Sequence, residues 1–229
     1  MDNMRVKRVE PIRHQVARVI RAAIADLRFK PGSLLIEREL CELTGASRPS
    51  VREALRQLES EGLVISVTGK GTVVASVTED EARQLYQVRA SLEGLAGRLF
   101  AEQATPEQRR ELAAVVDRFE AEIEDQGNLI PIKDEFYRVL FEGAGNEVAY
   151  QMLASLQRRT SLLRSKSLSA PGRPQETLRE LRAIVEKAEL GEADAVEQLC
   201  RDHVAKAEKA ALARLAELEK QFGLAQRTG

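Results

Sequence analysis

Two serines and two arginines lie within six residues, in the segment Ser47–Arg52 with the sequence SRPSVR. An arginine guanidinium can hold O6 and N7 of a guanine through two parallel hydrogen bonds, and a serine hydroxyl can donate to a phosphate. Arg48 and Arg52 are four residues apart, so on a helix they project from the same face. These residue types at this spacing predict contacts with double-stranded DNA. The simpler alternative is a pair of solvated surface arginines.

Three further features could reach the same ligand. Ser47 and Ser50 stand at the start of an expected helix, where the free backbone N–H groups favour an anion. Arg38, on the preceding expected helix, could hold a phosphate or a base edge. The segment Gly69-Lys70-Gly71 combines one cation with glycines that allow close approach, so it could reach the minor groove or the DNA backbone. A plain exposed turn is the alternative for that segment.

Helices on either side of a short turn would position these residues. Apolar residues recur at helical spacing over residues 12–28, and Pro31-Gly32 then disfavours further helix. A second short helix is expected over 37–43 and a third over 47–60. Only the turn 44–46 separates the last two, which is the geometry of a helix-turn-helix whose second helix enters the major groove.

The third helix has a clear start and an apolar back. Ser47 is the expected N-cap, and Pro49 falls in the first turn, where its missing N–H costs least. The face opposite the arginines carries Val51, Leu55 and Leu58. Two β-branched runs follow within residues 63–75, separated by the turn residues 68–71, which predicts a β-hairpin.

Strand signals are absent after residue 78, and long amphipathic stretches follow. These predict helices over 79–103, 106–126, 129–144, 147–166, 174–190 and 192–222. The expected fold is therefore mainly α: a winged helix-turn-helix domain over residues 1–77, then an all-helical bundle over 78–229. The bundle would form a ligand pocket between facing helices.

The net charge of −1 divides unevenly along the chain. Residues 1–75 carry 13 Lys and Arg against 9 Asp and Glu, a net charge of +4, and residues 76–229 carry the other 22 against 27, a net charge of −5. A basic first part and an acidic second part indicate that only the first part meets a polyanion.

Several other classes of protein are disfavoured. No apolar run approaches the roughly 18 residues of a membrane helix, and the first residues lack the apolar core of a secretory signal, so a cytoplasmic protein without a membrane partner is expected. Cys41 and Cys200, expected in different domains, predict free thiols. No phosphate-binding glycine loop or serine-nucleophile motif suggests an enzyme. A ligand-independent architectural DNA binder stays open as an alternative, although the large second domain exceeds what DNA binding requires.

The segment 37–64, ERELCELTGASRPSVREALRQLESEGLV, strongly resembles the DNA-binding domain of the GntR family of bacterial regulators, as do Pro31-Gly32 and the glycine-bearing hairpin. The resemblance implies a homodimer on a palindromic operator. We expect a repressor, although the sequence leaves activation open. The resemblance also implies that DNA is lined by the residues at the matching positions, which are Arg38, Ser47, Arg48, Pro49, Ser50, Arg52, Gly69 and Lys70.

The second part resembles the effector-binding FCD domain of the FadR-type subgroup. The matching segments are LYQVRASLEGLAGRLFA at 85–101, DEFYRVLFEGAGN at 134–146 and ELRAIVEKAELGEADAVEQLCRDHV at 180–204. The resemblance implies that a small molecule bound in the helical domain changes operator affinity.

Many members of that subgroup bind a divalent metal through one Asp and three His, and the metal then holds a carboxylate effector. In this sequence Lys133 stands at the Asp position, Tyr137 and Leu181 stand at two His positions, and only His203 matches. Asp134 is one residue out of register, about 100° around the helix, and is a poor substitute. One imidazole does not make a metal site, so we expect neither a metal nor another cofactor.

Lys133 could supply the missing positive charge directly. Arg89 falls on the RASLE segment, where the family often has an arginine that faces the cavity. Lys133, Arg89, Tyr137 and His203 would then bind an anionic effector such as an organic acid. The alternative is that these side chains form internal ion pairs or lie on the surface, with an apolar pocket for a long-chain or neutral ligand. His203 would then be a hydrogen-bonded core histidine.

Overall fold

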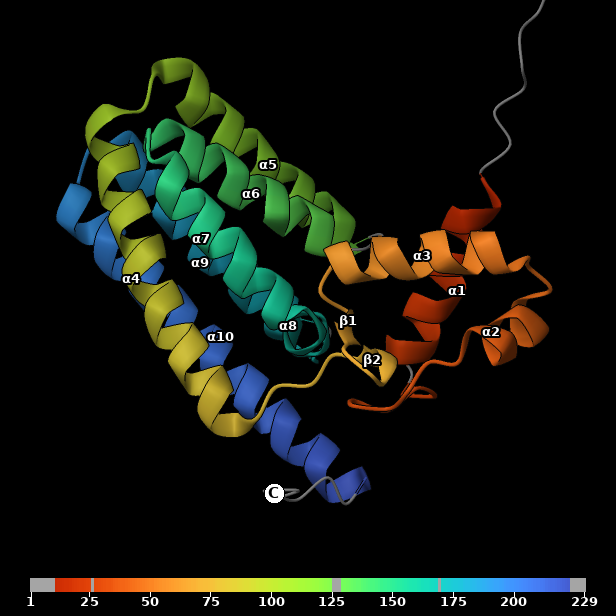
Figure 1. Ribbon diagram of the computed structural model, residues 1–229. Helices are drawn as coiled ribbons and strands as arrows, with labels where there is room; N and C mark the ends of the chain where they lie inside the picture. The colour runs from red at the N-terminus through yellow and green to blue at the C-terminus, as the bar shows by residue number, and fades with distance from the viewer. Residues whose placement is uncertain (1–10, 26, 125–128, 169, 223–229) are drawn as a thin grey trace, which may run out of the picture. The chain divides into compact units, whose positions relative to one another are not determined.

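The computed structural model describes residues 11–25, 27–124, 129–168 and 170–222 (Figure 1). The first ten residues, and residues 26, 125 and 126 of the expected helices, lie outside the described residues. The chain forms two compact units that meet between Ser76 and Val77. No described helix is long and apolar enough to cross a membrane. The predicted fold class, a winged helix-turn-helix followed by a helical bundle, is confirmed.

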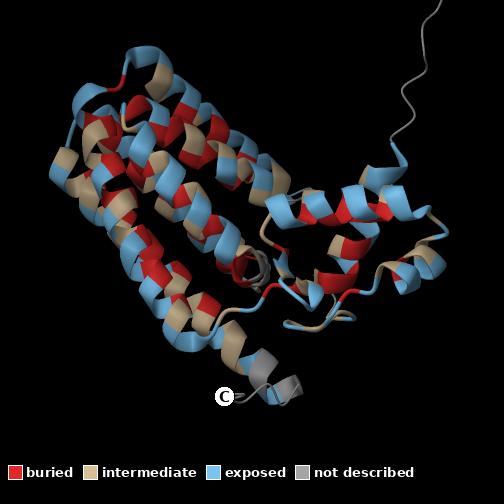
Figure 2. Cartoon of the chain, in the orientation of Figure 1, coloured by how far each residue is buried: buried red, intermediate tan, exposed pale blue. Residues whose placement is uncertain are grey.

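The first unit is a small helical core with a two-stranded wing. Its elements are α1 (Ile12–Ala25), α2 (Glu37–Thr44), α3 (Arg48–Ser60), β1 (Val64–Val67) and β2 (Gly71–Val74). The buried side of α3 carries Val51, Leu55 and Leu58, as its apolar spacing predicts, and α3 packs on α1. Figure 2 shows the buried residues of α3 on its side toward α1, while its other side is exposed.

Helix α1 ends earlier than the apolar spacing predicts. The helical pattern extends to Leu27, but the helix ends at Ala25. Leu27 has φ of 60°, a left-handed conformation that cannot continue a right-handed helix. The expectation of a helix through residue 28 is therefore wrong at its end, because no turn residue marks this position in the sequence.

The wing is the antiparallel pair β1 and β2, in which Val64 pairs with Val74 and Val67 with Gly71. Leu34 adds an isolated bridge to Val73, which ties the segment before α2 to the hairpin. The base of the wing is buried and its tip is exposed. The hairpin therefore has a fixed base and a tip that is free to meet a ligand.

The second unit is a bundle in which the first and last helices lie side by side. Its helices are α4 (Glu79–Gln103), α5 (Pro106–Glu124), α6 (Leu129–Gly143), α7 (Glu147–Arg159), α8 (Ser161–Leu168), α9 (Arg173–Glu189) and α10 (Ala193–Phe222). Figure 1 shows α4 running along α10, and α5 along α6. Their buried faces form a common apolar core.

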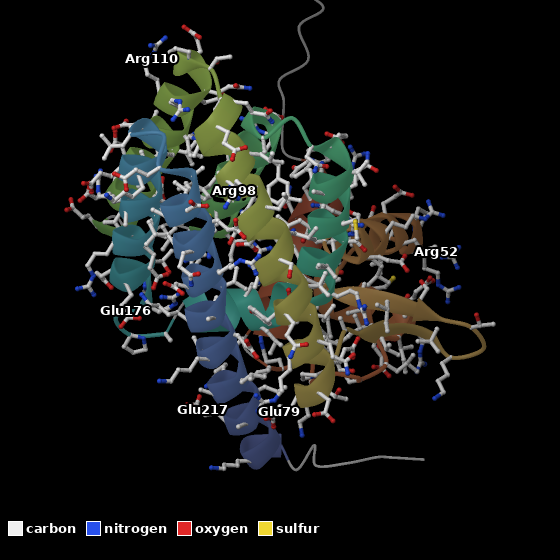
Figure 3. All side chains as sticks on the ribbon, turned by 90° about the vertical axis from the view of Figure 1, so that its left-hand side faces the viewer. Arg52, Glu79, Arg98, Arg110, Glu176 and Glu217 are labelled. Carbon is white, nitrogen blue, oxygen red and sulfur yellow. The ribbon has the colours of Figure 1, made fainter. Side chains whose placement is uncertain are left out.

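Close contact between α4 and α10 depends on a glycine. A Cβ at Gly97 would lie 2.7 Å from Sγ of Cys200 and 3.0 Å from Val196. Arg98, next to it, forms ion pairs with Asp194 and with Glu197 of α10 (Figure 3).

Both expected free thiols, Cys41 and Cys200, are free cysteines in the structure.

The stretch 147–166, expected as one helix, is divided into α7 and α8 at Thr160. The Thr160 hydroxyl donates to the carbonyl of Leu156 at 3.1 Å, a local bond that competes with a straight helix. After α8, Gly172 with φ of 78° precedes α9. Arg164 of α8, after this break, is buried in the bundle.

Candidate nucleic-acid interface and buried polar cluster

The turn between α2 and α3 is built by one glycine and two serines. Gly45 has φ of 66°, and its N–H donates to the carbonyl of Cys41. This left-handed glycine ends α2. Ser47 caps α3: its hydroxyl accepts from the backbone N–H of Ser50 at 3.5 Å and lies 3.0 Å from the Ser50 hydroxyl. Pro49 falls in the first turn of α3. The helix start is therefore fixed, with its positive dipole end exposed.

The arginines at this surface are not equivalent. Arg38 and Arg48 are exposed, and within the described part of the chain neither side chain has a hydrogen bond or an ion pair. Arg52, labelled in Figure 3, instead donates from Nε to both carboxylate oxygens of Glu37, at 2.8 and 2.9 Å. The Glu37 carboxylate raises the pKa of Arg52. Glu37 thus orients the Arg52 guanidinium and leaves its terminal nitrogens for another acceptor, an arrangement that the sequence analysis did not foresee.

The wing tip is open. Gly69 has φ of 78° and Gly71 has φ of 97°, so both need glycine. A Cβ at Gly69 would meet nothing within 4 Å, and Lys70 is exposed. The tip can therefore approach a polyanion with its backbone and one cation.

A buried polar cluster lies inside the second unit, beginning with Arg89 of α4. Its Nη2 and Nε donate to Oε1 of Glu93 at 2.8 and 3.0 Å, and both side chains are almost fully buried. Nη2 also donates to the Tyr137 hydroxyl at 3.3 Å. Burial opposes the charged form of Arg89, but Glu93 outweighs it and raises the pKa of the guanidinium.

Lys133 of α6 is the cluster's unusual member, because the residue is only 7% exposed and its ammonium has no ion pair with a described carboxylate. Nζ lies 3.1 Å from Nε2 of His203 and 5.7 Å from the centre of the Tyr137 ring. Burial and then the charges of Arg164 and Arg89 lower the pKa of Lys133 to about 7. The cluster therefore holds a cation that is poorly compensated.

His203 connects Lys133 to Glu180. Nδ1 lies 2.5 Å from Oε2 of Glu180, and burial followed by Lys133 lowers the pKa of His203 to about 4, so the ring is neutral. A neutral ring that donates from Nδ1 to the carboxylate accepts at Nε2 from Lys133. Burial would raise the pKa of Glu180, but its bonds to His203 and Arg173 lower it to about 2.

Arg173 completes the ion pairs around Glu180. Its Nη1 and Nη2 donate to the two carboxylate oxygens at 2.8 and 3.0 Å. Arg164 of α8 donates to Oδ1 of the exposed Asp134 at 2.6 Å. Sequence reasoning missed Glu93, Arg164, Arg173 and Glu180. Only Glu93 had a signal, its position four residues after Arg89 on one helix.

Two hollows adjoin this cluster. A cavity of about 10 Å³ lies inside it, lined by Tyr86, Arg89, Lys133, Arg164 and Thr177 among others. A groove of about 770 Å³ that is open to solvent runs between α9 and α10, and His203 and Arg173 reach it. Charged side chains on the surface line much of the groove, whereas the buried cations converge on the cavity. We therefore regard the cavity as the chemically distinctive feature.

The residues of the cluster do not fit a metal. Lys133 places an amine beside His203, Leu181 is buried in the apolar core, and Tyr137 contacts Arg89. Asp134 points to Arg164 at the surface. Within the described ranges, no group of three His, Cys, Asp or Glu residues could hold a metal ion. A buried ammonium would also repel a divalent cation.

The four residues predicted to bind an effector, Arg89, Lys133, Tyr137 and His203, lie together in this cluster. The alternative of internal ion pairs applies to Arg89, which pairs with Glu93, but not to Lys133. His203 is the hydrogen-bonded buried histidine that was also considered. Their role in binding stays a prediction.

Comparison with known proteins gives the same two-part division. The family model described as bacterial regulatory proteins, gntR family, matches residues 12–74, and the FCD domain model matches residues 84–206. An uncharacterized regulator of the helix-turn-helix type from Bacillus subtilis, YdhC, is 26% identical over 201 residues, which cover 86% of this chain and 90% of that protein. The Escherichia coli repressor RspR is 24% identical over 197 residues, which cover 85% of this chain and 86% of RspR.

Solved structures show the same fold. A putative GntR regulator from Rhodococcus sp. RHA1 superposes with a TM-score of 0.64 at 23% identity, covering 88% of this chain and 97% of that one. Lar of Listeria monocytogenes superposes with a TM-score of 0.65 at 18% identity, covering 91% of this chain and all of the other. At these identities the likeness concerns the fold alone.

Proposed function

Because the chain belongs to the GntR family of bacterial regulatory proteins, in the subgroup with a C-terminal FCD domain, it is a transcriptional regulator rather than an enzyme, and we propose how it works. Residues 1–77 bind operator DNA, and residues 78–229 form the dimer and bind an anionic effector. The effector contacts Lys133 directly, without a metal, and changes operator affinity. Repression is the proposed sign of regulation, as the name of RspR states for that relative.

The exposed start of α3 supports the proposed DNA contacts. Arg48 has no competing partner among the described residues, and Arg52 is held in place by Glu37. In this proposal these two arginines read base edges, and Ser47 and Ser50 donate to phosphates. The remaining proposed contacts come from Arg38, Pro49, Gly69, Lys70 and Gly71.

Apolar residues on the second unit support a homodimer. Val88 and Leu95 of α4 are 44% and 40% exposed, and Val148 and Met152 of α7 are 72% and 50% exposed. The two helices pack against each other, so their exposed apolar residues would be covered if a second copy bound there. A dimer matches a palindromic operator, whose half-sites lie about 34 Å apart.

The observation that carries the effector proposal is the buried Lys133 ammonium without a carboxylate partner among the described residues. Burying a charge is costly unless it is compensated. An anionic group of the effector would supply that compensation, and Arg89, Tyr137 and His203 are within reach of the same place.

The experiment is a two-step selection. Operator DNA is first selected from random duplexes with the purified full-length chain, and a panel of organic acids is then titrated against that complex in chelator. We expect a palindromic site and at least one acid that changes the affinity. A chain that binds all duplexes alike and responds to no acid would instead be the ligand-independent architectural binder.

A further inference from the structure

The three arginines on the exposed side of α3 differ in which nitrogen atom is already bound. Arg48 has no hydrogen bond or ion pair with a described residue. Arg56 uses a terminal nitrogen, because its Nη1 donates to Oε1 of Glu53 at 2.5 Å. Arg52 uses Nε, which donates to both carboxylate oxygens of Glu37 at 2.8 and 2.9 Å. Of the three, Arg52 is therefore the one whose stem is held while its terminal nitrogens have no described partner.

This contact limits how Arg52 can approach a base. A guanidinium can hold O6 and N7 of a guanine through the edge formed by Nη1 and Nη2, or through the edge formed by Nε and one terminal nitrogen. Because Glu37 occupies Nε, only the edge formed by Nη1 and Nη2 remains for two parallel bonds. Arg48 keeps both edges and can equally turn toward a phosphate.

The pair of Glu37 and Arg52 is not needed to hold α3 in place. Its two side chains are 36% and 59% exposed, and ion pairs as exposed as this add little stability. The buried side of α3 packs on α1, and Arg21 of α1 donates to both carboxylate oxygens of Glu61, directly after α3. The contact from α2 therefore acts on the orientation of the Arg52 side chain rather than on the position of the helix.

We propose that Glu37 is a specificity-determining residue of the DNA site, because it commits the Nη1 and Nη2 edge of Arg52 to one guanine. The inference rests on the proposed function, in which α3 reads an operator. Holding the side chain before DNA binds removes part of the entropy cost of ordering it on a base. The Glu37 carboxylate also repels phosphates beside Arg52, which disfavours the use of this arginine on nonspecific duplexes.

The test measures affinity of the full-length chain for its selected operator, for single-base variants of that operator and for random duplexes. Glu37→Ala removes the acceptor, whereas Glu37→Gln keeps one acceptor oxygen in the same place. Glu39→Ala is the matched control, because Glu39 is an exposed carboxylate in the same first turn of α2 and has no ion pair with a described residue.

We expect Glu37→Ala to lower the discrimination at one G·C pair by about threefold to tenfold, while binding to random duplexes stays unchanged or strengthens. Glu37→Gln should keep most of the discrimination and Glu39→Ala all of it. Arg52→Ala completes a double-mutant cycle. If Glu37 acts through Arg52, then adding Glu37→Ala to Arg52→Ala should change nothing further at that base pair.

Additive losses in the double variant would overturn the inference, as would equal effects of Glu37→Ala and Glu39→Ala. Uniform weakening on all duplexes in Glu37→Ala or Arg52→Ala would overturn it as well. If Arg52→Ala relaxes the preference at a base pair that Glu37→Ala leaves unaffected, the inference fails while the proposed function stands. A wild-type chain that selects no sequence would contradict both.

Discussion

Lys133 places a positive charge inside the second unit, where burial and the nearby arginines oppose it. Its ammonium is buried beside His203, and the His203 ring is held by Glu180 through a 2.5 Å contact. Arg89 and Arg164 crowd the same region and disfavour protonation of Lys133. If an anion binds beside Lys133, as proposed, it would offset this repulsion, so we expect stability, protonation and binding to be linked at this residue.

Effector binding should depend on pH around neutrality. The pKa of Lys133 is lowered to about 7 by burial and nearby arginines, and a bound carboxylate would raise it. Binding above pH 7 therefore takes up a proton, and the affinity for a carboxylate should weaken as pH rises, by up to about tenfold per pH unit. Calorimetry in buffers of different ionisation enthalpy measures the uptake. A pH-independent affinity, or proton release, would contradict this role of Lys133.

Lys133→Met should separate stability from function. Methionine keeps much of the volume and removes the buried charge, so the free energy of unfolding at pH 7 should hold or increase, by roughly 0–3 kcal/mol. The same variant should lose effector binding and its pH dependence. Urea denaturation measures the first effect and calorimetry the second. If the Lys133→Met variant kept full affinity for the carboxylate, Lys133 would not be the group that binds the effector.

Arg48→Ala and Arg52→Ala test the reading of bases. If each guanidinium holds a guanine, either substitution should cost about 1–3 kcal/mol of operator affinity and relax the preference at one base pair. Binding is compared on the selected operator and on single-base variants of it. Uniform weakening on all duplexes, with a smaller salt dependence, would assign that arginine to phosphate instead.

At the scale of elements, the sequence predicts most helices because their signals are local. Ser47, Pro49 and Gly45 mark the ends of α2 and α3, and the predicted helix-turn-helix is confirmed. The break at Thr160 could not be predicted, because threonine occurs inside many helices and acts here through hydrogen bonds from its hydroxyl to the carbonyls of Leu156 and Gln157. Leu27, in a left-handed conformation, has no sequence signal either.

The buried cluster was predictable only in part. The resemblance to the FCD domain brought Lys133, Tyr137, His203 and Arg89 to attention, and the structure gathers them. Arg173 and Glu180 pair across two turns of α9, whereas Arg164 enters from α8, so the place of Arg164 in the cluster depends on how the helices pack rather than on any local pattern.

The contact between α4 and α10 gives an element-scale prediction. An added Cβ at Gly97 would meet Cys200 Sγ at 2.7 Å and a backbone carbonyl at 3.3 Å, so Gly97→Ala should destabilise the fold by about 1–3 kcal/mol. Gly94→Ala is the matched control on the same helix, because it meets mainly the flexible side chains of Arg201 and Glu197. Urea denaturation compares the two. Equal effects would mean that the helices can separate at Gly97 without cost.

At the scale of the whole molecule, the two units divide the chemistry. The first unit presents cations at an exposed helix start, and the second buries its cations around a cavity. Regulation requires that the effector bind with different affinities to two states of the protein, one that can bind DNA and one that cannot. Such coupling between sites is typically worth about 1–3 kcal/mol, or roughly 5–150-fold in affinity.

The most direct test of the central claim is to measure operator affinity of the full-length chain against a titrated carboxylate effector, with chelator present. The account predicts a change of about 5-fold or more that persists in chelator and disappears in Lys133→Met. An effect that requires zinc or nickel, and that His203→Ala abolishes while Lys133→Met does not, would contradict direct recognition of the anion by Lys133.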